Sequence, residues 1–83
     1  MNRTERSIVE FLLQLPTARG VHALAPDDPL LNRRLLDSLG VVKMVVFCEE
    51  KFGIEIPDEE VIPENFESVR ALAQLIGRLQ LRG

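Results

Sequence analysis

The 83-residue sequence contains no tryptophan and no tyrosine, and it has one cysteine and one histidine. A lone cysteine cannot form a disulfide within the chain, and one histidine leaves no cluster of zinc-binding side chains. No apolar run reaches the ~20 residues of a membrane span, and the N-terminus lacks the basic and then apolar segments of a secretory signal. We therefore expect no metal site, no membrane span, and a location in the reducing cytoplasm.

The sequence also lacks the positive charge of a nucleic-acid-binding protein. Ten Lys and Arg are outnumbered by 13 Asp and Glu, which gives a net charge of −3, whereas binding to a phosphate backbone requires a concentrated basic face. Hydrophobic residues make up 46% of the chain, enough for the core of one small domain over residues 1–83. A domain of this size has little room for a catalytic cleft, so we expect a monomeric module on which other proteins act.

The spacing of apolar residues predicts helices and no strands. Thr4 is expected to cap a first helix over about residues 4–15, which Pro16 ends. Residues 16–37 then form a loop that is long for a compact domain, so its apolar side chains should anchor it to the bundle. These side chains belong to Val21, Leu24, Leu30, Leu31 and Leu35.

The second helix, over about residues 38–52, has the clearest limits. Ser38 is a favourable N-cap, the run that follows from Val41 to Phe52 contains no proline or glycine, and Gly53 stands where a helix often ends in a left-handed residue.

Two further helices are expected towards the C-terminus. Asp58 is expected to cap a short helix over about residues 58–62, which Pro63 closes, and a last helix runs over about 68–80. The prediction is an all-α bundle of three longer helices and one short one, with a long loop between helices 1 and 2.

The second helix carries two apolar faces, although a surface helix needs only one for its own core. At about 100° per residue, the first face holds Val41, Met44, Val45, Cys48 and Phe52. The neighbouring face holds Leu39, Val42 and Val46 beside Lys43, Glu49 and Glu50. The second face is either a docking surface or a sign that the helix is buried on two sides, and the periodicity does not distinguish these alternatives.

Ser38 has two interpretations as well. A serine at the start of a helix is most often a cap that accepts a hydrogen bond from the next turn. Its hydroxyl also stands at the positive end of the helix macrodipole, beside free N–H groups that would stabilise an attached phosphodiester. His22 lies in the distant loop and no other base is near in the sequence. An external enzyme would therefore have to modify this serine.

Three segments carry a resemblance to a known family. They are residues 35–40 (LLDSLG), the helix over 41–52, and residues 53–60 (GIEIPDEE), with residues 63–69 (PENFESV) also fitting. Together they resemble the acyl carrier and peptidyl carrier proteins, and most closely the stand-alone aminoacyl and D-alanyl-type carriers. The resemblance spans about residues 5–78.

The resemblance implies that Ser38 carries 4′-phosphopantetheine, transferred from coenzyme A by a phosphopantetheinyl transferase that recognises Asp37 and Leu39. The thiol of this arm would hold an acyl or aminoacyl cargo as a thioester. An activating ligase would load the cargo, and downstream enzymes would modify or transfer it. The second face of the helix would contact these enzymes through Leu39, Val42 and Val46, and Cys48 on the first face would be inert packing.

Four positions depart from the fatty-acid carriers of this family, which usually have acidic residues at several of them. This chain has Gly40 after the Asp-Ser-Leu motif, and the cations Arg33, Arg34 and Lys43 around it. Because charge governs partner choice, we expect a specialised aminoacyl or acyl carrier of a secondary-metabolite or cell-envelope pathway. The alternatives are that the cations are ordinary solvated surface, and that the protein is a non-enzymatic adaptor with Ser38 as a simple cap.

Overall fold

The computed structural model describes residues 1–82, which form three longer helices and one short one. The longer helices are α1 (Arg3–Leu13), α2 (Ser38–Phe52) and α4 (Val69–Arg82), and the short one is α3 (Pro63–Phe66). Two 3₁₀ turns, Pro16–Ala18 and Asp58–Glu60, lie between them, and no strand occurs in this part of the chain. The predicted all-α bundle is confirmed.

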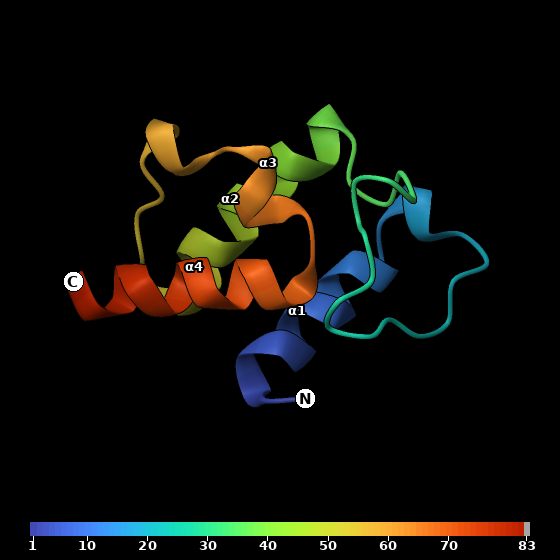
Figure 1. Ribbon diagram of the computed structural model, residues 1–83, viewed down its shortest axis with the longest axis horizontal. Coiled ribbons are helices and arrows are strands. Elements are labelled where there is room, and N and C mark those ends of the chain that lie inside the picture. Colours follow the sequence, from blue (N-terminus) through green and yellow to red (C-terminus); the bar gives the residue numbers. More distant parts are fainter. Residues whose placement is uncertain (83) are drawn as a thin grey trace.

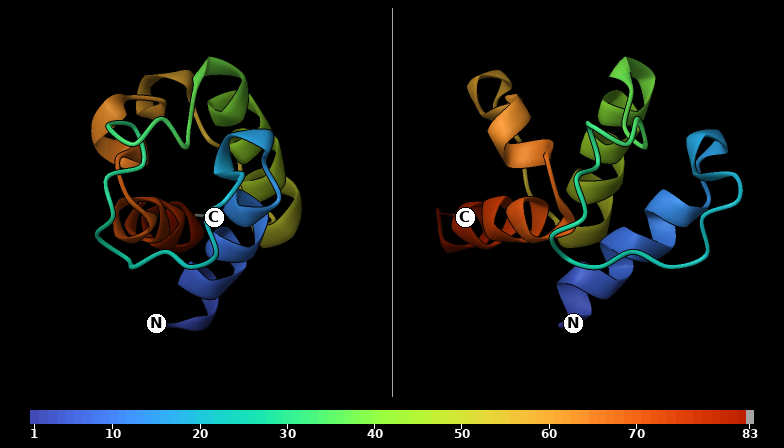
Figure 2. Two further views of the ribbon diagram at one scale, coloured as in Figure 1. Left: turned by 90° about the vertical axis from the view of Figure 1, so that its right-hand side faces the viewer. Right: turned by 45° about the vertical axis from the view of Figure 1, so that its right-hand side comes forward.

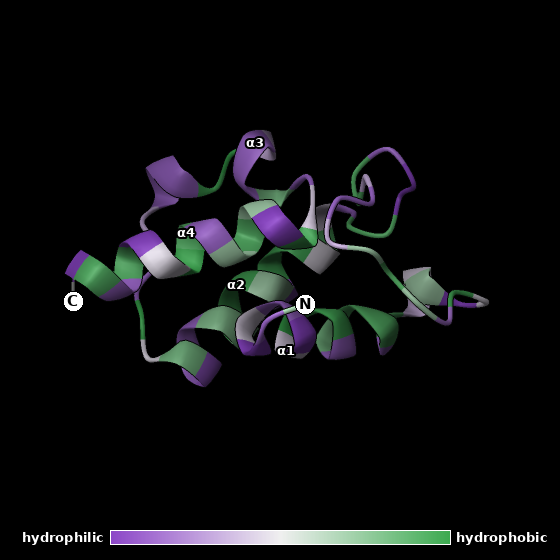
Figure 3. Cartoon of the chain, turned by 60° about the horizontal axis from the view of Figure 1, so that its bottom comes forward, coloured by the Kyte–Doolittle hydropathy of each residue, from purple (hydrophilic) through white to green (hydrophobic). Residues whose placement is uncertain are grey.

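Helix α4 is the element on which the other three pack. It contacts α1, α2 and α3, and Figures 1 and 2 show it running across the bundle with α1 and α2 at different angles to it. Its residues Leu72, Leu75 and Ile76 are completely buried. In Figure 3 the ribbons of α1 and α4 change between hydrophobic and hydrophilic every few residues, as amphipathic helices do.

The start of α1 differs from the prediction, because Asn2 caps it in place of Thr4. The Asn2 side chain accepts a hydrogen bond from the Glu5 N–H at 2.8 Å, and the Glu5 carboxylate accepts one from the Asn2 N–H at 3.0 Å. A glutamate three residues after the cap is the sequence sign of this capping box. The helix ends at Leu13, and Leu15 packs into the core from outside it.

The segment between α2 and α4 also differs from the prediction. Residues Asp58–Glu60 form a 3₁₀ turn without a side-chain cap, and Pro63 begins α3 instead of ending a helix. Proline suits the first turn of a helix, where its missing N–H is not needed. The short helix predicted over 58–62 therefore lies at Pro63–Phe66, and α4 continues to Arg82, beyond its predicted end.

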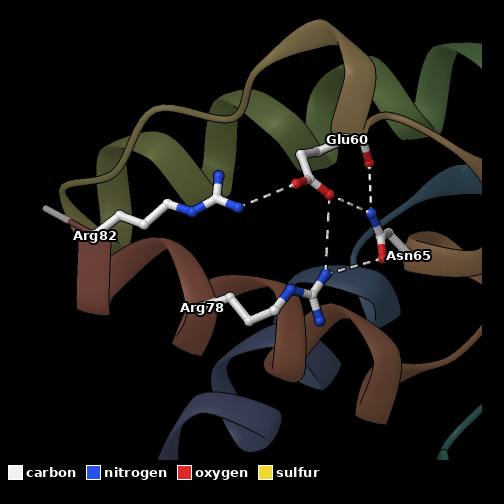
Figure 4. A network of polar contacts seen from close by, with 4 residues as sticks. All are labelled: Glu60, Asn65, Arg78 and Arg82. Carbon is white, nitrogen blue, oxygen red and sulfur yellow. Dashed lines mark hydrogen bonds and ion pairs between the residues drawn. The ribbon is translucent and has the colours of Figure 1, made fainter.

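A polar network holds this segment against α4 (Figure 4). The buried Asn65 amide donates hydrogen bonds to the Glu60 backbone oxygen at 2.8 Å and to its Oε1 at 3.0 Å. Arg78 in turn donates to Asn65 Oδ1 at 3.2 Å, and Arg82 lies 3.8 Å from Glu60 Oε2. The acidic turn and α3 are thus both tied to the last two turns of α4.

The loop between α1 and α2 is anchored to the bundle, as predicted. Leu24, Leu30 and Leu35 are buried, and Val21 and Leu31 are partly buried. Backbone hydrogen bonds also join the loop to the C-terminal part of the fold, from Leu30 N–H to the Glu67 oxygen at 2.8 Å and from Arg70 N–H to the Pro26 oxygen at 2.9 Å. This anchoring fixes the chain before it enters α2.

No helix within residues 1–82 combines the length and the apolar character needed to cross a bilayer. The same residues contain no group of three or more His, Cys, Asp and Glu placed to hold a metal ion.

Candidate functional site

Asp37, and not Ser38, caps helix α2. The Asp37 backbone is extended, with φ −94° and ψ −175°, and its Oδ1 accepts a hydrogen bond from the Gly40 N–H at 2.7 Å. Ser38 is therefore the first residue of the helix and is exposed. The prediction that Ser38 is the N-cap was wrong by one position. The consequence matters for function, because the serine hydroxyl is not engaged in capping.

Gly40 lies in close contact with this cap. A Cβ atom added at this position would lie 3.1 Å from Asp37 Oδ1 and 3.3 Å from a methyl carbon of Leu36. Both distances are shorter than ordinary van der Waals contact, so a larger residue would require small shifts of the capping carboxylate and of the buried Leu36. The departure from the fatty-acid carriers at Gly40 thus has a packing reason in this chain.

The turn that leads into α2 is pinned from two sides. The Thr17 hydroxyl donates a hydrogen bond to the Leu35 oxygen at 2.6 Å, which ties the turn to the 3₁₀ turn Pro16–Ala18. The Leu35 N–H donates to the Leu30 oxygen at 2.9 Å. Arg34, the residue before Leu35, has a positive φ of 59°. Ser38 is therefore presented from a fixed stretch of backbone.

The two faces predicted for α2 differ sharply in exposure. On the first face, Met44 and Cys48 are 0% exposed, while the second face is open to solvent. Its members Leu39, Val42 and Val46 are 62%, 58% and 49% exposed. The helix is therefore not buried on two sides, and these three residues form an exposed apolar stripe that begins next to Ser38. Its use by partner proteins stays a prediction.

Exposed apolar surface also occurs where the sequence reasoning did not place it. Val61 and Ile62, just before α3, are 37% and 40% exposed. They border a hollow of about 180 Å³ that α2 and the long loop complete through Val41 and Leu31. The run of Val-Ile-Pro after an acidic turn was the available signal. A second hollow, of about 170 Å³, lies on the other side of the α2 start and is lined by Leu15, Pro16, Thr17, Asp37, Leu39, Gly40 and Lys43.

The three cations near the motif have different surroundings. Arg33 lies 3.3 Å from the Asp28 carboxylate and donates a hydrogen bond to it. Arg34 and Lys43 are exposed, and neither takes part in an ion pair within residues 1–82. Of the three cations named from the sequence, Arg33 is therefore paired, and Arg34 and Lys43 are unpaired within the described residues.

Cys48 has no access to solvent and cannot serve as the thiol of the site. Burial, with a smaller contribution from the Glu49 carboxylate, raises the pKa of its thiol from 9.0 to about 12. Since the thiolate is the nucleophile, this cysteine is packing material, as predicted. Any thioester chemistry needs a thiol from elsewhere.

Comparisons with known proteins point to one family. The family model described as "Phosphopantetheine attachment site" matches residues 6–76. "Aminoacyl carrier protein 2" of Bradyrhizobium diazoefficiens is 39% identical over 75 residues, which cover 90% of this chain and 80% of that protein. The "D-alanyl carrier protein" of Streptococcus pyogenes serotype M1 is 33% identical over 54 residues, covering 65% of this chain and 68% of that protein.

A solved structure agrees in fold. One chain of a structure described as "Crystal structure of FAD-dependent dehydrogenase" superposes with a TM-score of 0.72 at 35% sequence identity. The match covers 89% of this chain and 99% of that chain, so the matched chain is about as short as this one.

The start of α2 fits a phosphodiester esterified to a serine. The Ser38 side chain is exposed, and the N–H groups of Ser38 and Leu39 have no acceptor among the hydrogen bonds of residues 1–82. These N–H groups stand at the positive end of a 15-residue helix, where a negative charge is stabilised. The Asp37 carboxylate is held by Gly40.

Proposed function

Because the chain belongs to the phosphopantetheine attachment family, we propose that Ser38 is the residue that carries its arm. Family membership gives the role of a carrier protein and the covalent 4′-phosphopantetheine group. The observation that carries the assignment to Ser38 is its exposed hydroxyl at the first position of α2, left free because Asp37 caps the helix. Asp37 and Leu39 flank this hydroxyl and are the residues that a transferase would contact first.

The protein itself is a carrier and not an enzyme in this proposal. When bound, the arm supplies the thiol that holds the cargo as a thioester. The polypeptide holds the serine at a fixed place and presents the exposed stripe Leu39, Val42 and Val46 to a phosphopantetheinyl transferase, an activating ligase and downstream enzymes. Tethering raises the local concentration of the cargo at a docked enzyme, so weak docking is sufficient. We place this monomeric carrier in the cytoplasm.

The descriptions of the relatives support a proposal for the class of cargo. Their printed descriptions include aminoacyl and D-alanyl carriers, and we propose an amino acid or a related small acid as the cargo, in a specialised pathway. The solved chain comes from a structure described as an FAD-dependent dehydrogenase. An 83-residue bundle is too small to hold FAD and an active site, so we propose a flavin-dependent dehydrogenase as one of the downstream enzymes.

The intact mass of the protein tests the assignment. Apo protein incubated with coenzyme A, Mg²⁺ and a phosphopantetheinyl transferase should gain the mass of one arm, and Ser38→Ala should gain none. Ser68→Ala is the matched control, since Ser68 also stands at a helix start but accepts the capping hydrogen bond of Ala71. Ser68→Ala should accept the arm and lose about 1 kcal/mol of stability, whereas Ser38→Ala should change stability by less than about 0.5 kcal/mol.

Two outcomes would count against the proposal. Wild-type protein that stays unmodified, with a transferase active on another carrier, would favour the adaptor interpretation. An arm retained by Ser38→Ala would place the attachment elsewhere. The mass of the loaded protein from its host tests the dehydrogenase, because an acyl group that has passed two hydrogen atoms to FAD would be two hydrogen atoms lighter than the acyl group that the ligase loads onto the arm.

A further inference from the structure

Arg34 occupies a backbone conformation that favours glycine. Its φ of 59° lies in the left-handed region, which residues with a Cβ adopt at a cost. A glycine would relieve this cost without disturbing the turn, whose hydrogen bonds come from its neighbours, such as the Leu35 N–H to the Leu30 oxygen. The stability of the turn therefore does not explain the arginine.

The guanidinium of Arg34 also forms no ion pair within the described chain. Arg33 beside it is paired with Asp28 at 3.3 Å, whereas Arg34 is exposed and has no carboxylate within ion-pair distance among residues 1–82. Lys43 is in the same situation, one helical turn beyond Leu39 and at the edge of the hollow that Asp37 and Leu39 line. Both unpaired cations lie close to Ser38 in the sequence.

Charge on the exposed stripe changes along α2. Lys43 borders the end near Ser38, and the exposed Glu50 follows towards the C-terminal end, where the Glu49 carboxylate accepts a hydrogen bond from the Ile56 N–H. At the Ser38 end, the exposed Asp37 carboxylate accepts a hydrogen bond from the Gly40 N–H at 2.7 Å, so it lies against the first turn of the helix. A protein that docks over Ser38 on Leu39 and Val42 therefore meets Lys43 beside them, and the exposed Arg34 stands four residues before Ser38 in the chain.

We propose that Arg34 and Lys43 select a phosphopantetheinyl transferase whose docking face presents carboxylates around an apolar contact. The inference rests on the proposed role of Ser38. Ligases and later enzymes reach the thiol at the far end of the arm, but the transferase must bring the phosphate of coenzyme A to the Ser38 oxygen. All of these partners meet the exposed stripe, but only the transferase must reach the Ser38 oxygen itself, so its docking depends most directly on the groups around the serine. Complementary charge there speeds the productive encounter.

The transferase of the host and coenzyme A serve as the probe, with kcat/KM measured from intact mass at low and high salt. Arg34→Gly should lower kcat/KM roughly fivefold at low salt, mainly through KM, while raising the denaturation midpoint because backbone strain is relieved. Arg34→Lys should keep most of the wild-type rate. Arg33→Ala, the matched control, should change the rate less than about twofold, and Lys43→Glu should lower it more than Arg34→Gly.

Opposite effects on stability and on transfer separate recognition from a structural role. High salt should bring the variants together, because it screens exposed charges. Equal rates for Arg34→Gly and wild type at low salt, a faster rate for Arg34→Gly, or equal losses in Arg34→Lys and Arg34→Gly would overturn the inference. In those cases the arm is still added to Ser38, whereas failure of the proposed function would leave wild-type protein without an arm.

Discussion

At the scale of single residues, two side chains a few turns apart on α2 differ in their access to solvent and therefore in their reactivity. Ser38 is exposed at the first position of the helix, and Cys48 is 0% exposed on the core face. The cysteine carries the more reactive group, but burial raises its pKa to about 12 and keeps it protonated. The thiol of the arm is then the reactive one in the modified protein.

Alkylation tests this difference. At roughly pH 8, where an ordinary thiol reacts through its thiolate fraction, native apo protein should resist iodoacetamide, and protein carrying the arm should take up one equivalent. In denaturant Cys48 should react in both forms. Rapid labelling of Cys48 in the native apo protein would contradict its burial.

The same thiol gives a pH dependence of stability. The native pKa lies above the unfolded value of 9.0, so the stabilising contribution of the neutral thiol is complete below about pH 9 and is lost as the pH rises towards about 12. Above pH 9 the free energy of unfolding of the wild type should therefore fall more steeply than that of Cys48→Ala, as measured by chemical denaturation. Parallel curves would contradict the raised pKa.

At the scale of the elements, Asn65 joins the acidic turn, α3 and α4. Asn65→Ala removes two donors to Glu60 and the acceptor of Arg78, and it leaves the backbone oxygen of Glu60 without this partner. We expect a loss of about 2 kcal/mol and faster amide hydrogen exchange over residues 58–66. Asn32→Ala, at an exposed loop position, is the matched control and should have little effect. Equal hydrogen-exchange rates in the two variants would show that the Asn65 network does not hold the acidic turn and α3 against α4.

How well the sequence predicts an element depends on its length. Helix α2 was predicted at its residues Ser38–Phe52, because a long run without proline ends at Gly53, whose φ is 64°. A helix of four residues such as α3 shows no apolar period, so Pro63 was interpreted as a stop instead of a start. The cap was predicted one residue too late, at Ser38 instead of Asp37, since both side chains suit an N-cap.

At the scale of the whole molecule, the candidate site depends on which apolar residues are buried. The second face of α2 could be judged only once the fold showed Met44 and Cys48 of the first face to be buried, since periodicity shows two faces but not which one is packed. The pairing of Arg33 with Asp28 likewise depends on the path of the loop. The motif around Ser38 was recognisable without the fold. Which of the three cations is paired could be seen only in the fold.

Two leucines of α4 test whether this helix organises the bundle. Leu72 is 0% exposed where α4 meets the other helices, and Leu81 is 90% exposed on the last turn. Leu72→Ala leaves a cavity in a small core and should cost about 3 kcal/mol, whereas Leu81→Ala should change the free energy of unfolding by less than about 0.5 kcal/mol. Chemical denaturation measures both. The total stability of a domain this small is only several kcal/mol. At denaturant concentrations that unfold much of the Leu72→Ala protein, this variant should therefore accept less of the arm at Ser38 than the wild type does. A Leu72→Ala protein as stable as Leu81→Ala would show that α4 is not the element on which the fold depends.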